Sequence, residues 1–97
     1  MAKMNLADKH PAEKAVSAIP LFKGEGLTTV IQILEQQELK EHISKVPALL
    51  ICVIGEVIFE NEKGIKETLK NGDYLEIEPF VKHRVVGIKD TQLLLLK

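Results

Sequence analysis

The sequence predicts an all-β domain, organised as a small antiparallel barrel or a double-sheet roll. Between residues 47 and 85, short apolar runs alternate with polar turns, and turn signals recur about every eight to twelve residues. The chain has no tryptophan and few other aromatic residues, so its interior must be built from Leu, Ile and Val. These side chains pack well on pleated surfaces, which supports the same fold class.

The composition is that of one small globular domain. The chain has 97 residues, of which 45% are hydrophobic, so it can bury a core without disulfides. Acidic and basic residues are mixed and the formal net charge is -1, which argues against nucleic acid as a partner. The single cysteine, Cys52, excludes an intrachain disulfide and favours a reducing, cytoplasmic location. No signal peptide or membrane span is expected from the apolar runs.

Residues 1–14 are predicted to form a flexible or edge N-terminal arm, because they are polar and show no clear periodicity. Residues 15–97 are expected to form the single barrel domain. Within the arm, His10 is interpreted as a solvated histidine. Residues 15–22 alternate well enough for a short strand, and Pro20 restricts that strand to a sheet edge or to its own end.

The middle of the chain contains two more predicted strands. Residues 27–34 are rich in β-branched side chains. Residues 35–41 have helix propensity, but so short a segment between two β runs favours a continued strand with a bend or turn. Residues 47–54 are apolar on both faces, which predicts a strand that is buried on two sides. Cys52 is interpreted as a core residue in this strand, because reactive thiols need polar, partly exposed surroundings.

The last 42 positions are predicted to form short antiparallel strands joined by tight turns. Asn71 and Gly72 give the strongest turn signal, and Pro79 places a loop before His83. The charged run over residues 60–70 is interpreted as a solvated hairpin face. About eight strands are expected in all. In this half they cover residues 56–60, 65–69, 74–77, 83–88 and 93–96.

His42, Gly55 and His83 occur at spacings that resemble the two sequence motifs of the cupins, a family of small β-barrel proteins. The first motif runs Gly-x5-His-x-His-x3-Glu-x6-Gly. Counting back from Gly55, its histidine positions fall on His42 and Ser44, and its glutamate position falls on Ala48. Only the first of these three keeps the residue of the motif.

The second cupin motif runs Gly-x5-Pro-x-Gly-x2-His-x3-Asn. Counting back from His83, its first glycine falls on Gly72. The proline, second glycine and asparagine positions hold Glu78, Phe80 and Gly87. The resemblance covers residues 27–96. It implies an antiparallel double-stranded β-helix, or jelly-roll barrel.

The resemblance to cupins also implies a metal site of three imidazoles and one carboxylate, a set that suits Zn, Fe, Mn or Ni. His42 and His83 are the candidate ligands, and a divalent transition metal is the candidate cofactor. A third ligand would come from Glu41, Glu78, Gln32 or a bound substrate. Glu41 faces inward beside His42 only if the strand bends or bulges. One alternative is a metal-free histidine pair at the barrel mouth, and another makes one histidine a general base.

The predicted function is binding of a small molecule inside the barrel without turnover, because two metal-ligand positions are lost. The alternative is a metal-dependent cupin enzyme, of the dioxygenase or isomerase type, that uses His42 and His83. Tyr74 either lines the pocket or covers a sheet, and Phe80 either narrows an entrance or packs on a partner. The sequence identifies no catalytic residue and no substrate, and leaves enzymatic activity open. The candidate pocket residues are His42, His83, Ser44, Gln32, Tyr74 and Phe80.

A homodimer is expected, because residues 48–54 and 93–96 are apolar on both faces. A strand in a lone small barrel normally exposes one face to water, so the outward residues, including Leu94 and Leu96, would form an apolar patch. Cupins are commonly dimers, which points the same way. The alternative is that the N-terminal arm folds back over its own barrel. The expected partners are therefore a second copy and a small molecule, without nucleic acid or membrane.

Overall fold

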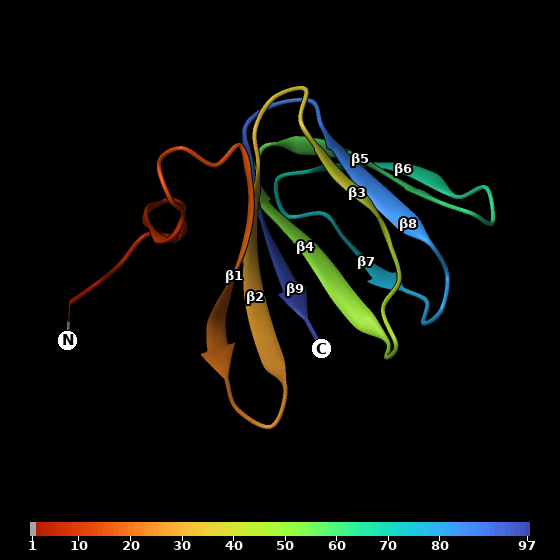
Figure 1. Ribbon diagram of the computed structural model, residues 1–97, viewed down its shortest axis with the longest axis horizontal. Coiled ribbons are helices and arrows are strands. Elements are labelled where there is room, and N and C mark those ends of the chain that lie inside the picture. Colours follow the sequence, from red (N-terminus) through yellow and green to blue (C-terminus); the bar gives the residue numbers. More distant parts are fainter. Residues whose placement is uncertain (1) are drawn as a thin grey trace.

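A computed structural model describes residues 2–97 and consists of two antiparallel β-sheets that pack face to face (Figure 1). Met1, which belongs to the predicted arm, lies outside the described residues. None of the helix in residues 2–97 is long and apolar enough to cross a membrane. The elements in chain order are η1 (Leu6–Lys9, a 3₁₀ helix), β1 (Val16–Lys23), β2 (Leu27–Ile33), β3 (Glu38–His42), β4 (Ala48–Ile54), β5 (Glu56–Asn61), β6 (Lys66–Lys70), β7 (Tyr74–Ile77), β8 (His83–Gly87) and β9 (Thr91–Leu96).

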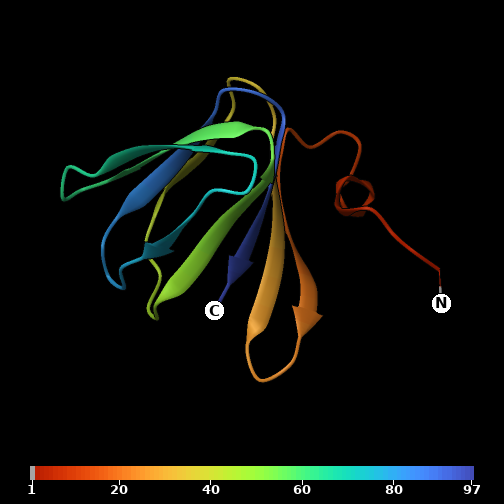
Figure 2. The ribbon, with the colours of Figure 1, turned by 180° about the vertical axis from the view of Figure 1, so that it is seen from behind.

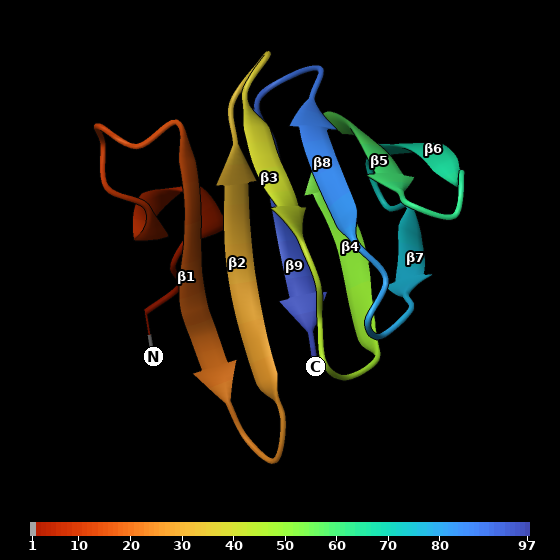
Figure 3. The ribbon, with the colours of Figure 1, turned by 45° about the vertical axis from the view of Figure 1, so that its right-hand side comes forward.

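The all-β prediction is confirmed: residues 2–97 contain nine strands, close to the expected eight. The extra strand arises because residues 34–37 turn the chain between β2 and β3, where a bend or turn was expected. The five-stranded sheet has the order β1-β2-β9-β4-β7, and the four-stranded sheet has the order β3-β8-β5-β6. β1 is an edge strand with a bulge between Pro20 and Phe22, as the proline predicted. Figure 3 shows β1 lying beyond the edge of the four-stranded sheet.

The core lies between the two sheets and is formed by alternate residues of the central strands. Leu50 and Cys52 of β4 pack there with Leu93 of β9 and with Val57 and Phe59 of β5. All five are buried. Burial raises the pKa of the Cys52 thiol, and the nearby acidic side chains add to this effect. The interpretation of Cys52 as a core residue is therefore confirmed.

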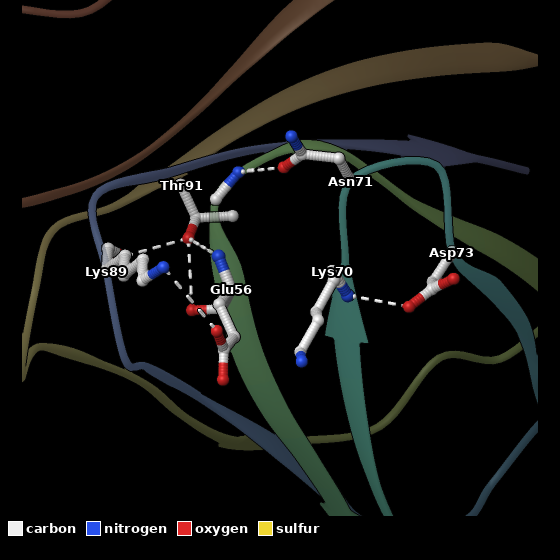
Figure 4. Close-up of polar contacts among 7 residues, drawn as sticks. Glu56, Lys70, Asn71, Asp73, Lys89 and Thr91 are labelled. Carbon is white, nitrogen blue, oxygen red and sulfur yellow. Dashed lines mark hydrogen bonds and ion pairs between the residues drawn. The ribbon is translucent and has the colours of Figure 1, made fainter.

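Hydrogen bonds between three loops close one end of the barrel (Figure 4). The Gly55 amide donates to Oδ1 of Asn71 at 2.7 Å, and the Glu56 amide donates to Oγ1 of Thr91 at 3.0 Å. The Thr91 hydroxyl donates in turn to the Lys89 carbonyl at 2.8 Å. These contacts tie the β4–β5, β6–β7 and β8–β9 connections to one another.

Gly55 and Gly72 hold the backbone conformations that this end requires. Gly55 has a φ of +113°, and a Cβ atom there would overlap Thr91 and lie 2.5 Å from the Asp90 carbonyl oxygen. Gly72 has a φ of +85° in the predicted turn, where the Lys70 amide donates to the Asp73 carboxylate at 2.8 Å (Figure 4). Left-handed backbone at both turns is readily adopted only by glycine.

The N-terminal arm lies on the outer side of the five-stranded sheet, away from the four-stranded sheet (Figures 1 and 2). His10 is half-buried there, so its interpretation as a solvated histidine is wrong. Its Nδ1 lies 2.9 Å from Oγ of Ser17, and its Nε2 lies 3.0 Å from Oε1 of Gln92. These two side chains point outward from β1 and β9, and they satisfy both ring nitrogens of His10. The arm is thereby fastened to the sheet.

Candidate functional site

The structure brings together the two histidines that the motif spacing singles out. β3 pairs with β8 so that His42 lies opposite His83, after a register shift between Leu39 and His42. The two Nε2 atoms are 3.0 Å apart, and the rings meet edge to face with centroids 4.1 Å apart. His83 is buried, whereas His42 is exposed.

The hydrogen bonds around the histidine pair indicate where its protons lie. Nδ1 of His42 is 2.9 Å from the Lys40 carbonyl oxygen, which can only accept, so this nitrogen carries the proton. Nε2 of His42 is then an acceptor for Nε2–H of His83. Burial, and then the charges of His42 and Lys97, lower the pKa of His83, so this ring is neutral near pH 7.

The two imidazoles fit the first two positions of a transition metal. Metal binding would require the other tautomer of His83, with the ring proton on Nδ1, which lies 3.3 Å from the Val81 carbonyl oxygen, and with Nε2 free. Zn–N bonds of about 2.0–2.1 Å in a tetrahedral site place two nitrogens about 3.3 Å apart, close to the observed 3.0 Å. Among residues 2–97, however, no group of three His, Cys, Asp or Glu side chains is placed to hold a metal. Water or a ligand would have to fill the other positions.

Gln32 and Ser44 have structural partners instead of lining a pocket with the histidines. Gln32 was predicted to line the pocket, but its side chain lies on the outer face of β2. Its neighbours Ile31 and Ile33 face the core, and side chains alternate between the two faces of a strand. Its side chain accepts from Gln92 and donates to the backbone of the arm. Ser44 is buried in the β3–β4 loop, where its hydroxyl donates to the Val46 carbonyl at 2.7 Å. The proposed third ligand Glu78 forms an ion pair with Lys63 at 2.8 Å.

Phe80 and Gln36 occupy glycine positions of the cupin motifs and keep a left-handed backbone. Their φ angles are +63° and +64°, and among residues 2–97 they are the non-glycine residues with positive φ. The Phe80 amide donates to the Ser44 carbonyl at 2.8 Å, which joins the β7–β8 and β3–β4 loops. The Phe80 ring is exposed. Both positions therefore adopt a left-handed backbone although neither holds the glycine of the motif.

A cavity of about 390 Å³ lies between the β5–β6 hairpin and β7. Phe59 and Leu69, which are 3% and 4% exposed, form its apolar floor. Tyr74 lines its rim and is the one predicted pocket residue among the lining residues. The Phe59 ring stacks on His83, with centroids 5.6 Å apart and an interplanar angle of 23°. The cavity therefore adjoins the histidine pair and is separated from it by this ring.

Four polar residues line the same cavity: Asn61, Glu67, Glu76 and Glu78. Glu67 of β6 lies opposite Phe59 of β5 in the hairpin, so both side chains project from the same face of the sheet. Residues 62–68 are exposed, in agreement with the interpretation of residues 60–70 as a solvated face, and Glu67 also lines the cavity. Its alternation with Leu69, two residues away, was the signal in the sequence.

Comparisons with known proteins identify the fold. No model of a known protein family matches the chain, and no curated protein sequence matches it. Three solved structures align closely at low sequence identity. A cupin superfamily protein from Desulfitobacterium hafniense has a TM-score of 0.82 and 15% identity, and the alignment covers 95% of this chain and 84% of that chain. An RmlC-like cupin from Desulfovibrio desulfuricans has a TM-score of 0.80 and 17% identity, with 99% of this chain and 94% of that chain covered. An RmlC-like cupin family protein from Methanocaldococcus jannaschii has a TM-score of 0.75 and 17% identity, with 91% of this chain and 84% of that chain covered. The last is described as a double-stranded β-helix. The chain therefore has the double-stranded β-helix fold of the cupin superfamily.

Proposed function

We propose that this barrel binds a small molecule in the cavity between the β5–β6 hairpin and β7, without chemical turnover. The observation that carries the proposal is the cavity itself. Its volume of about 390 Å³ is within the range of small-molecule sites, which is roughly 300–1,000 Å³. Phe59 and Leu69 offer a buried apolar floor, and Asn61 and Glu67 add polar groups that can orient a ligand.

Binding without turnover is favoured by the residues at the motif positions. Ser44 and Ala48 stand where the motif has a histidine and a glutamate, so the metal set is incomplete. Cys52 is fully buried and its thiol pKa is raised, which makes it a poor nucleophile. The reduced cysteine also supports a cytoplasmic location.

A fragment screen followed by amide chemical shifts tests the proposal. Fragments that bind should shift the amides of Phe59, Leu69 and Leu75. Ile65 lines the cavity and is partly exposed, so Ile65→Trp should fill the cavity and weaken binding of the hits at least tenfold. Ile88→Trp is the matched control, because Ile88 is exposed beyond β8. Hits that bind equally well to both variants would place the ligand elsewhere and defeat the proposal.

Metal-dependent cupin chemistry at His42 and His83 is the second candidate function. The observation in its favour is the 3.0 Å approach of the two Nε2 atoms, with a backbone carbonyl facing each Nδ1. When bound there, a divalent metal would supply a Lewis acid. Metal analysis of protein purified without an affinity tag tests this candidate. One equivalent that is lost in both His42→Ala and His83→Ala would establish the metal site, whereas metal below 0.1 equivalent would reject it.

We also propose that the chain forms a homodimer through the outer face of the five-stranded sheet. Ile51 of β4 lies beside Leu94 of β9 on that face, and both are partly exposed. The arm of the same chain covers the region around Gln92, at the other end of this face. The apolar side chains beyond the arm would be covered by a second copy.

A further inference from the structure

We propose that the ligand of the β5–β7 cavity is an organic cation with an apolar body, such as an aryl- or alkylammonium ion. This inference rests on the proposed function, because it names the chemical class that the same cavity would take. It is carried by a juxtaposition of two features of the lining. Carboxylates stand on the rim of the cavity, and aromatic and aliphatic side chains form its floor and wall.

The charges of the lining side chains favour a cation. Glu67, Glu76 and Glu78 line the cavity, and no lysine or arginine in the described part of the chain does so. Lys63 neutralises the charge of Glu78 through an ion pair, with Nζ 2.8 Å from Oε1. Within residues 2–97, the carboxylates of Glu67 and Glu76 make no ion pair and accept no hydrogen bond. The lining residues thus include two acidic residues without a partner, which favour a positively charged ligand and disfavour an anion.

The position of Glu67 links this charge to the apolar floor. Because β5 and β6 pair in register, Glu67 lies opposite Phe59, and Leu69 follows it on the same face of β6. A ligand whose apolar body packs on Phe59 and Leu69 would hold its charged end beside Glu67. Tyr74 on the rim adds an aromatic ring, and aromatic rings attract ammonium groups through their π faces.

The same geometry disfavours a bare metal ion as the ligand. Hard cations such as Ca²⁺ need six or more oxygen ligands that converge on one point. Among residues 2–97, no three acidic, histidine or cysteine side chains converge in this way. An organic cation needs only one or two carboxylates, because its apolar body supplies the rest of the contact.

Three probes of similar shape and different charge test the inference: 2-phenylethylammonium, 2-phenylethanol and 3-phenylpropionate. Amide chemical shifts of the full chain, recorded at neutral pH and low salt, report binding and its location. The cation is expected to shift the amides of Glu67, Leu69 and Leu75, and to bind at least tenfold more tightly than the anion. Salt should weaken binding of the cation, because the carboxylates on the rim are exposed to solvent.

Charge-removing variants show which side chains cause the preference. The double variant Glu67→Gln/Glu76→Gln should weaken binding of 2-phenylethylammonium about fivefold, and leave binding of 2-phenylethanol unchanged. Glu13→Gln is the matched control, since Glu13 is an exposed carboxylate in the N-terminal arm. A double variant that binds the cation as tightly as the control does would overturn the role of the two carboxylates.

The outcomes separate this inference from the proposed function. If all three probes shift the cavity amides with equal affinity, the cavity binds small molecules but does not select for charge, and only this inference fails. If the anion binds best, this inference fails and the proposed function stands. If the fragment screen gives hits in the cavity but the ammonium probe does not bind, the inference fails alone. If neither the screen nor the probes shift the cavity amides, both fail.

Discussion

The Nε2 atoms of His42 and His83 lie 3.0 Å apart, although 41 positions separate the two residues in the sequence. Antiparallel pairing of β3 and β8 brings them together, and a register irregularity after Leu39 sets the approach of the first ring. One ring is buried and the other is exposed, so the pair connects the interior with solvent. Protonation of His83 therefore couples the stability of the barrel to pH.

Stability should fall as the pH drops below about 6.5, because the folded protein lowers the pKa of His83 through burial and through the charge of His42. Above this pH the ring is neutral in both states. Below it, the unfolded chain binds a proton more readily than the folded one, until the pH reaches the lowered pKa. Urea unfolding between pH 8 and pH 5 measures this loss. The variant His83→Asn should lose less stability over that range, and an equal loss in both proteins would contradict the assignment.

Gly55→Ala should destabilise the closed end of the barrel by about 2–3 kcal/mol. The new Cβ would overlap Thr91 and Asp90, and alanine would also be strained at the positive φ of this position. Gly64→Ala is the matched control. Gly64 also has a positive φ, but no atom lies within 4 Å of the position of its Cβ. This control should cost only about 1 kcal/mol. Urea unfolding compares the two, and equal losses would show that the packing around Gly55 adds nothing.

Phe80→Gly and Gln36→Gly should each raise the free energy of unfolding by about 0.5–1 kcal/mol, because glycine relieves the left-handed strain at both positions. Phe22→Gly is the control, since Phe22 is as exposed as Phe80 but lies in strand β1. The Phe22→Gly variant should lose about 1 kcal/mol of unfolding free energy. Thermal and urea unfolding measure all three. A loss of stability in Phe80→Gly as large as that in Phe22→Gly would mean that the Phe80 ring makes contacts that outweigh the strain.

Leu94→Glu should convert the proposed dimer into a monomer, because it places a charge on the outer face of the five-stranded sheet. Its β-type circular dichroism spectrum should persist, since Leu94 points away from the core. Ile88→Glu, an exposed position beyond β8, should leave the dimer intact. Size-exclusion chromatography with light scattering at micromolar concentration gives the mass. A monomeric unmodified protein would rule out the dimer, and a dimeric Leu94→Glu variant would place the interface elsewhere.

Local signals in the sequence were sufficient for most of the fold. The turn at Asn71 and Gly72, the edge strand with Pro20 and the burial of Cys52 all follow from rules that act over a few residues. The motif spacing also singled out His42 and His83, because a family pattern records contacts between distant strands. For this reason the histidine pair could be predicted without knowledge of the strand register.

The remaining features depend on tertiary packing and could not be predicted in this way. Gln32 was expected in the pocket, but the register of β2 turns it outward to Gln92 and the arm. The two nitrogens of His10 find partners only because β1 and β9 place Ser17 and Gln92 on one face. The cavity forms between the hairpin and β7, which belong to different sheets. No local pattern in the sequence shows that the edge strands β6 and β7 leave a space between the two sheets.

The cavity lined by Leu69 and Leu75 is the proposed ligand site of this barrel. The most direct test is methyl NMR of leucine-labelled protein during titration with 2-phenylethylammonium and with the compounds of the fragment screen. The methyl groups of Leu69 and Leu75 should shift in a saturable way, while those of the core residue Leu93, which does not line the cavity, should remain in place. If the leucine methyl groups remain unshifted with the ammonium probe and with every fragment at millimolar concentration, or if shifts occur only far from β6 and β7, the cavity is not the ligand site.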